Sequence, residues 1–440
     1  MSVLAFAAYG GACYPTQPRS NRIVADAEEV TAPPPHRTRT IRAINRIGGA
    51  LAPRWPSLDP DGIVADAARR AKSRQFGDEG FLNALPRLIE AVEREGRLNW
   101  IGRVACKQSL TMALESRFGI YRHRAKHPEL AQAPIEKPVF IVGFPRTGTT
   151  ILFNLLAQDP ANRAPLGWET QFPNPPPVED TFTSDPRIER ARKYFGQMDQ
   201  MAPNLASIHE VGAELPQECM PILAHSLLSP QPSITFNIPS YQDWVDTQDA
   251  SPAYRYHRHF LQHLQSHVMR DRWVLKSPVH LATLDSLLTE YPDARLIFTH
   301  RDPAKTIPSL ASLIYTVRGI VTDDVDPEAV GREQLKWWAN ALDRATAVRE
   351  DHAEKSAQFI DVHFEDVIAD PVRVLERVYD AFDLPWGEGV EARMRGFLAA
   401  NPRGKHGAHQ YQLSDFGLTL DVIRDRFAGY CQAYDVPLAM

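Results

Sequence analysis

The chain has 440 residues, of which 43% are hydrophobic and 23% are charged. These fractions are typical of globular proteins and exclude wholesale disorder, a collagen and a coiled coil. The 49 Lys and Arg residues against 54 Asp and Glu residues leave a net charge of −5. This balance argues against a general nucleic-acid-binding protein, although a local basic pocket for an anionic ligand stays open.

The four cysteines are far apart and include no C-x-x-C pair, which argues against a disulfide framework and favours a reducing compartment. No apolar run reaches the ~18 residues of a membrane span. His259, His263 and His267 share a helical spacing, but no acidic residue completes an H-E-x-x-H zinc motif. We therefore expect a cytoplasmic protein with no stable membrane span and no metal.

Residues 1–50 are predicted to form a flexible arm, because three consecutive prolines at 33–35 are followed by four arginines. Residues 51–136 are predicted to form a helical cap, since apolar residues recur there at helical spacing. Residues 137–440 are expected to form the main α/β domain.

The α/β prediction comes from four short apolar segments, each followed by a helical pattern. The segments are residues 139–142, 273–275, 296–299 and 359–363. Alternating strands and helices predict a P-loop-like, three-layer α/β fold with a central parallel sheet flanked by helices. The loops that follow the strands then meet at one edge of the sheet, where ligands bind.

The first loop at this edge runs from Gly143 to Thr150. Gly143 and Gly148 have the G-x-x-x-x-G spacing of a phosphate-binding loop, but Thr149 stands where such loops carry lysine. Backbone N–H groups and the start of the next helix still favour an anion there, and Arg146 offers a cation. The alternative is an ordinary glycine-containing turn.

Three other segments carry candidate chemistry. Arg301 ends a predicted strand and Ser309 lies eight residues further on, so both are suited to one oxyanion. Lys276 ends another strand, and His280 follows at the start of the next helix. Near the C-terminus a glycine-rich basic loop contains Arg403, Gly404 and Lys405. Taken alone, Arg301 and Ser309 could instead form a salt bridge and an ordinary helix serine, and the basic loop could be a surface turn. A lone lysine or histidine is usually structural or solvated, but the position of Lys276 and His280 at the sheet edge favours a functional role.

Together, P-R-T-G-T-T, L-K-S-P-V-H, H-R-D-P with its later serine, and R-G-K-H-G resemble the sulfotransferase family over residues 137–415. The resemblance is to the bacterial-type branch and, in part, to protein-tyrosine sulfotransferases. It implies 3′-phosphoadenosine 5′-phosphosulfate (PAPS) as donor, PAP as product and no metal.

The resemblance also implies roles for the residues of these four segments. Arg146, Thr147, Gly148, Thr149 and Thr150 would bind the 5′-phosphosulfate. Arg301 and Ser309 would bind the 3′-phosphate, and the loop of Arg403, Gly404 and Lys405 would close on it. Lys276 would neutralise the bridging oxygen as the sulfuryl group leaves.

The catalytic base stays open between several residues. Glu169, in a G-W-E-T segment, resembles the glutamate of tyrosyl-protein members and ranks first. His280 ranks second, because cytosolic members place histidine two residues nearer the lysine, where Pro278 stands here. Glu214 or Glu218 is the third option, either as base or as part of the acceptor-binding pocket.

We expect a sulfotransferase that acts on a hydroxyl, or less readily an amine, of a small molecule, lipid or carbohydrate. The alternatives are a P-loop kinase or nucleotide hydrolase, against which Thr149 counts, and a non-catalytic nucleotide-binding module. The sequence excludes neither a monomer nor a homo-oligomer.

Overall fold

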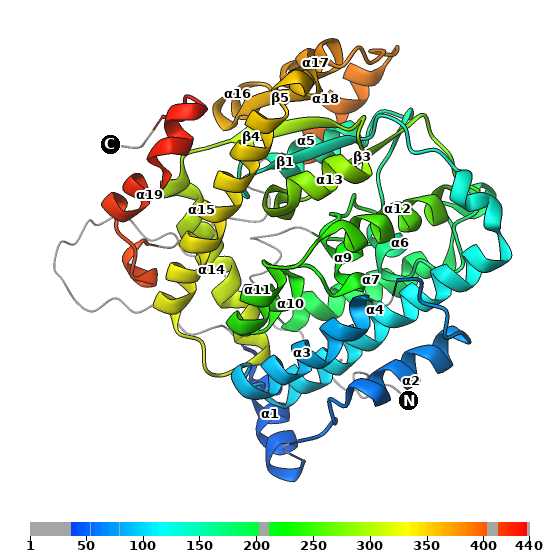
Figure 1. Ribbon diagram of the computed structural model, residues 1–440, viewed down its shortest axis with the longest axis vertical. Coiled ribbons are helices and arrows are strands. Elements are labelled where there is room, and N and C mark those ends of the chain that lie inside the picture. Colours follow the sequence, from blue (N-terminus) through cyan, green and yellow to red (C-terminus); the bar gives the residue numbers. More distant parts are fainter. Residues whose placement is uncertain (1–36, 53, 79, 202–210, 403–411, 438–440) are drawn as a thin grey trace.

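The computed structural model describes residues 37–437, except residues 53, 79, 202–210 and 403–411. Its centre is a five-stranded parallel sheet in the order β2-β3-β1-β4-β5 (Figure 1). The strands are β1 (Val139–Gly143), β2 (Asn162–Arg163), β3 (Arg272–Lys276), β4 (Arg295–His300) and β5 (Phe359–His363). The predicted α/β fold with a central parallel sheet is confirmed.

Strand β1 shows why the sheet has helices on both faces. All five of its residues are buried, and successive side chains point to opposite faces. Val139 and Ile141 join an apolar cluster with α5 (Thr149–Leu156), α17 (Pro371–Ala381) and α18 (Val390–Ala400). Phe140 and Val142 face the opposite layer, which is built from α12 (Ser251–Gln265), α13 (Leu284–Glu290), α14 (Pro303–Val321), α15 (Pro327–Asp351) and α19 (Leu420–Ala433).

The carboxyl ends of the three central strands meet at one edge. Strand β1 pairs in parallel with both β3 and β4, so Gly143, Lys276 and His300 end neighbouring strands at that edge. The loops that leave these strands lead into α5, the 3-10 helix η4 (Pro278–Thr283) and α14. The predicted motifs therefore start from adjacent points in space.

The region before the sheet is helical, as the spacing of apolar residues in 51–136 predicted. Its helices are α2 (Pro60–Ala71), α3 (Gly80–Glu95), α4 (Trp100–Lys126) and η1 (Pro128–Gln132). An additional helix, α1 (Arg39–Leu51), lies where the sequence predicted the end of a flexible arm. Thr38 caps this helix, and Ile41 and Asn45 are buried, so this part of the arm prediction is wrong. Residues 1–36 lie outside the described residues.

Between β2 and α12, the described chain forms a series of helices, most of them short. They are α6 (Gly167–Gln171), η2 (Glu179–Thr181), α7 (Pro186–Met201), α9 (Met220–Leu223), η3 (Ala224–Ser226), α10 (Gln231–Thr235) and α11 (Pro239–Val245). Three further pieces, η5 (Ala353–Gln358), α16 (Phe364–Ala369) and η6 (Ser414–Phe416), connect the C-terminal elements. None of the helices within the described ranges combines the length and apolarity needed to cross a membrane.

Candidate active site

The loop after β1 has the backbone geometry of an anion cradle. Gly143 has φ +132°, and a Cβ there would fall 2.5 Å from the Thr299 carbonyl oxygen. Gly148 has φ +85° and caps the N-terminus of α5. Both positions require glycine because side chains rarely adopt these angles. The first N–H groups of α5 have no partners within the helix, so they are available to an anionic group.

Thr147 fixes the loop rather than presenting its hydroxyl to a ligand. Its side chain is fully buried, with Oγ1 2.5 Å from the Phe144 carbonyl oxygen and 2.6 Å from Thr299 Oγ1. The second contact ties the loop to β4. Any contribution of Thr147 to anion binding therefore comes from its backbone N–H.

Arg301 joins the end of β4 to the same loop. Its Nη1 donates to the carbonyl oxygen of Arg146 at 2.6 Å, and its guanidinium lies 3.7 Å from the ring centroid of Phe364. Arg146 itself is exposed. Ser309 is buried in α14, eight residues beyond Arg301. The structure thus places the Arg301 side chain against the backbone of the loop that carries Arg146.

Lys276, at the end of β3, carries a further cationic group of the site. Its Nζ donates to Glu218 Oε1 at 2.6 Å and lies 3.4 Å from Thr150 Oγ1 on the first turn of α5. The Lys276 and Glu218 side chains are only 4% and 11% exposed. A cation and a carboxylate therefore adjoin the anion cradle in a largely enclosed position, where their interaction is screened less than on the surface.

Backbone pairing explains how Glu218 reaches this place. The Gln217 N–H donates to the Pro165 carbonyl oxygen at 2.8 Å, and the Cys219 N–H donates to the Lys276 carbonyl oxygen at 2.9 Å. These bonds hold Glu218 beside the end of β3. The sequence named Glu218 as a candidate, but no local pattern connects it with a lysine 58 residues away.

Glu169, the carboxylate ranked first as base, is completely buried in an ion pair. Arg163 donates to both of its oxygens, and the Leu166 N–H donates to Oε2 at 2.9 Å. With its oxygens occupied in this way, Glu169 holds the start of α6 to β2. The geometry favours a structural role for Glu169 over proton transfer.

His280 lies in the core beneath the sheet edge. It is fully buried, its Nδ1 lies 2.7 Å from the Tyr254 hydroxyl, and its ring packs edge-on against Phe140. Burial and the neighbouring His257 hold its pKa well below the usual histidine range. A neutral histidine can accept a proton, but His280 packs among core side chains rather than beside the cradle.

The remaining candidates separate into a surface residue and a segment outside the described residues. Glu214 is exposed and pairs with Arg192, also exposed. Its position is that of a solvated surface charge rather than a pocket residue. Arg403, Gly404 and Lys405 lie outside the described residues, so the closing loop stays a prediction. Across the described ranges, no cluster of three His, Cys, Asp or Glu side chains is arranged to hold a metal ion.

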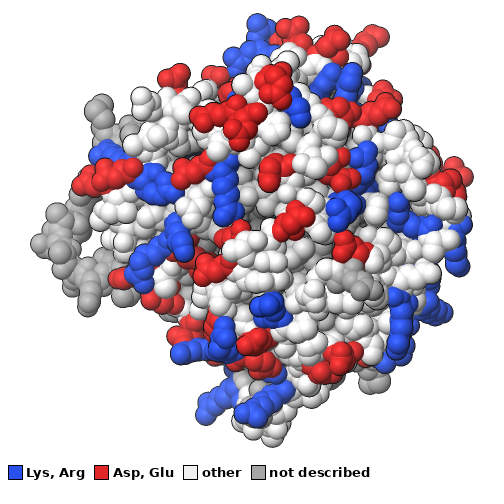
Figure 2. Space-filling view, in the orientation of Figure 1, with Lys and Arg blue, Asp and Glu red and all other residues white. Residues whose placement is uncertain are grey.

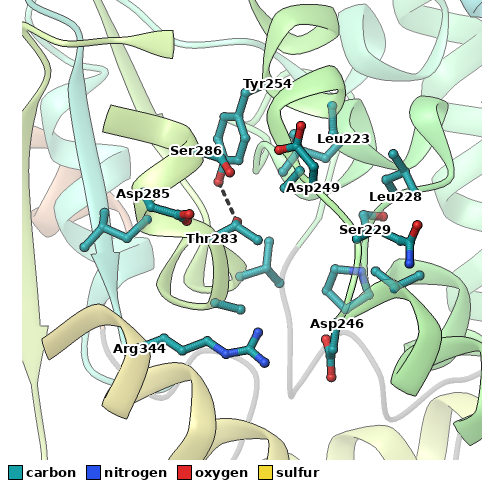
Figure 3. Close-up of a pocket in the computed structure, with 18 of the residues that line it drawn as sticks. Leu223, Leu228, Ser229, Asp246, Asp249, Tyr254, Thr283, Asp285, Ser286 and Arg344 are labelled. Carbon is teal, nitrogen blue, oxygen red and sulfur yellow. Dashed lines mark hydrogen bonds between the residues drawn. The ribbon is translucent and has the colours of Figure 1, made fainter. Parts of the chain in front are cut away.

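A cavity of about 410 Å³ is lined in part by segments that follow Lys276 and Glu218 in the chain (Figure 3). Val279, three residues after Lys276, and Leu223, five residues after Glu218, are among its largely apolar lining. Asp246 and Arg344 lie toward one side of the cavity in Figure 3. Its described lining includes neither Lys276 nor Glu218.

Comparison with known proteins identifies the family. The sulfotransferase family profile matches residues 138–388, more than half of the chain. This chain belongs to the sulfotransferase family. The crystal structure of sulfotransferase STF9 from Mycobacterium avium is 30% identical, covers 86% of this chain and 97% of its own, and superposes with a TM-score of 0.79. The family prediction and, with it, the prediction of a sulfotransferase enzyme are confirmed.

Two further relatives agree with this placement. Sulfotransferase STF1 from Mycobacterium tuberculosis is 32% identical, with 84% of this chain and 98% of the other covered and a TM-score of 0.74. The omega-hydroxy-beta-dihydromenaquinone-9 sulfotransferase Stf3 of Mycobacterium bovis is 28% identical over 289 residues, which are 62% of this chain and 70% of that protein. The kinase and hydrolase alternative has no support among these matches.

Proposed function

We propose that this sulfotransferase transfers the sulfuryl group of PAPS to an acceptor hydroxyl, with Lys276 and Glu218 as its central pair. The observation that carries the proposal is the 2.6 Å contact between Lys276 Nζ and Glu218 Oε1 next to Thr150, at the start of α5. It combines the cation needed by a leaving phosphate with the carboxylate needed by an attacking hydroxyl.

In this mechanism the loop from Gly143 to Thr150 holds the 5′-phosphosulfate through its N–H groups and the α5 N-terminus. The Glu218 carboxylate takes the proton of the acceptor hydroxyl, and the hydroxyl oxygen forms a bond to sulfur. The bond between sulfur and the bridging oxygen breaks, and the electron pair stays on that oxygen. Lys276 stabilises the negative charge that develops there, so PAP leaves as an anion.

We propose Arg301, with Ser309, as the group that recognises the 3′-phosphate. The guanidinium of Arg301 already donates to the Arg146 carbonyl beside the cradle, and a planar guanidinium suits a phosphate. Glu169, which the sequence ranked first as base, is replaced in this proposal by Glu218, because its oxygens are taken up by Arg163 and the Leu166 N–H.

The first acceptor class to test is an apolar lipid with a free hydroxyl. The M. bovis relative is named as an omega-hydroxy-beta-dihydromenaquinone-9 sulfotransferase, and this supports a lipid for the present chain. Carbohydrate and small phenolic hydroxyls form the second arm of the screen. Sulfated product is detected by mass spectrometry together with PAP release.

Calorimetric titration with PAP tests the donor site, with ATP and magnesium as the rival ligand. We expect PAP to bind, and Arg301→Ala to lose at least about tenfold of PAP affinity while affinity for adenosine 5′-phosphate changes little. Arg332→Ala, which removes an exposed cation of α15, is the matched control. Equal losses for both nucleotides would refute the 3′-phosphate role, and binding of ATP without PAP would overturn the proposed donor.

A further inference from the structure

Large apolar side chains gather on the outer face of α1 and the turn after it. Ile44, Ile47 and Leu51 are 39%, 59% and 81% exposed, and Trp55 is 50% exposed. These are four of the eight large hydrophobic residues that are exposed in the described chain. Helical spacing puts the first three on one stripe. Contiguous exposed apolar surface of this kind marks an interaction site.

The α1 helix is fixed to the body of the protein at both ends. Before the helix, Arg37 Nε donates to the Gly319 carbonyl oxygen at 2.5 Å. Gly48 lies so close to Trp100 that a Cβ there would fall 2.4 Å from the ring, and Trp55 stacks on Trp100 with centroids 5.5 Å apart. Packing on another face of α1 therefore keeps the apolar stripe directed away from the body of the protein.

The charge of this region has a single sign. Residues 37–58 contain five arginines and no Asp or Glu. Arg39, Arg42, Arg46 and Arg54 are exposed and form no ion pair with any described residue. Blue and uncharged side chains lie together at the lower end of the molecule in Figure 2, where Figure 1 places α1.

We propose that this face, formed by α1 with Arg54 and Trp55, docks on the anionic surface of a lipid membrane. An amphipathic helix with arginines on its polar face and apolar side chains on the other lies in the plane of a bilayer interface. Arginine stems extend to the headgroups, and tryptophan favours the interfacial layer. The arginines attract anionic lipids and add to the affinity that apolar burial gives.

The charge pattern also selects against a second copy of the chain. A twofold contact through this region would bring two clusters of positive charge near one another, and like charges close to an interface are unfavourable. A membrane rich in anionic lipid offers the complementary charge. This inference goes beyond the proposed function and does not depend on it.

Sedimentation with lipid vesicles tests the proposal on the full-length protein. We expect it to bind vesicles of phosphatidylcholine with phosphatidylglycerol, to bind pure phosphatidylcholine far more weakly, and to be released as salt rises. The double variant Ile47→Ser, Leu51→Ser should lose about tenfold or more of the binding constant. Arg42→Gln with Arg46→Gln should lose both affinity and salt dependence.

The matched control is Met269→Ser with Val422→Ser, which removes two exposed apolar side chains, 62% and 49% exposed, from other parts of the surface. It should bind vesicles like the unaltered protein. The melting temperature and the PAP affinity should stay unchanged in every variant. A loss of vesicle binding is then due neither to unfolding nor to damage at the donor site. Absence of vesicle binding by the unaltered protein, or vesicle binding that the α1 substitutions do not weaken, would overturn the proposal. Conversion of a dimer to a monomer by Ile47→Ser, Leu51→Ser, without vesicle binding, would assign the face to a second copy.

Discussion

Lys276 and Glu218 form an ion pair that is almost completely enclosed at the carboxyl edge of the sheet, with Nζ and Oε1 2.6 Å apart. Removal of one member of a buried pair leaves the other charge without a partner, which typically costs ~3–5 kcal/mol of stability. Substitutions at these two positions therefore need variants that keep size, and stability has to be measured beside activity.

Glu218→Gln should lower kcat by about 10²–10⁴-fold, because an amide cannot take the acceptor proton. The affinity for PAP should change by no more than a few fold, since the proton is transferred at the acceptor side. Steady-state kinetics with PAPS and calorimetry with PAP measure the two effects. Glu169→Gln is the comparison, and a larger kcat loss there, per molecule shown to be folded at the assay temperature, would return the base assignment to Glu169.

Lys276→Met should lower kcat by about 10²–10³-fold, the usual effect of removing one group that stabilises developing charge. Methionine keeps most of the side-chain length but leaves Glu218 unpaired. The double variant Lys276→Met, Glu218→Gln should therefore unfold at a higher denaturant concentration than Lys276→Met alone. Single-turnover measurement of PAP formation reports the chemical step. Normal turnover in Lys276→Met would exclude this lysine from catalysis.

Glu169→Gln should destabilise the protein by roughly 3–5 kcal/mol, because it leaves Arg163 buried without its counter-charge. The matched variant, Glu214→Gln, breaks an exposed pair with Arg192 and should cost about 1 kcal/mol or less. Urea unfolding followed by circular dichroism measures both. Equal stability of the two variants would contradict the structural role of Glu169.

Gly148→Ala should weaken PAP binding by about tenfold or more. A side chain at φ +85° is strained, and the added Cβ would lie 2.9 Å from Val367 Cγ1, so the cradle must shift. Gly396→Ala, in α18, meets no atom within 4 Å and should leave binding intact. Isothermal titration with PAP compares them. Unaltered affinity in Gly148→Ala would show that the loop geometry does not set donor binding.

Buried histidines predict loss of stability in acid. Desolvation lowers the pKa of His225, His257 and His263 to about 3 and that of His259 to about 4. An unfolded histidine has a pKa near ~6.5. The unfolded state thus binds protons that the native state excludes, and the free energy of unfolding falls as pH decreases below ~6.5. Each histidine adds up to ~1.4 kcal/mol per pH unit to this slope until the pH reaches its folded pKa.

His263→Gln tests this slope, because Gln can still donate to the Pro173 carbonyl oxygen that His263 Nε2 contacts at 3.0 Å. The free energy of unfolding, measured in urea between pH 5 and 7, should depend on pH less steeply by about one proton. His267→Gln, which alters an exposed histidine four residues later, is the comparison. The same slope in both variants would contradict the prediction.

The parallel sheet and the phosphate loop could be predicted because their signals are local. A run such as Val139–Val142, followed by glycines five residues apart and a helical pattern, identifies strand, loop and helix within some twenty residues of sequence. Strand β2 has two residues and produces no such pattern, so it was missed. Helix α1 was missed because the nearby prolines and arginines are typical of a flexible arm, and the few apolar residues, such as Ile41 and Ile44, produce only a weak helical pattern.

The candidate carboxylates show what sequence alone leaves undetermined. Glu169 lies in the short helix α6 and Glu218 in a loop, and the sequence around each glutamate does not show whether an arginine or a lysine faces it. Only the pairing of residues 217–219 with Pro165 and Lys276 places Glu218 at the site, and only β2 brings Arg163 against Glu169.

The sequence by itself determined the fold class, the family, the order of the motifs and the edge of the sheet where they meet. Hydrophobic periodicity and glycine spacing act within a few residues, and strand direction then follows from the handedness of the crossovers. The tertiary structure decided which carboxylate contacts Lys276, which histidines are buried, and which face of α1 stays uncovered. These properties depend on contacts between segments distant in the chain, and a linear pattern does not specify such contacts.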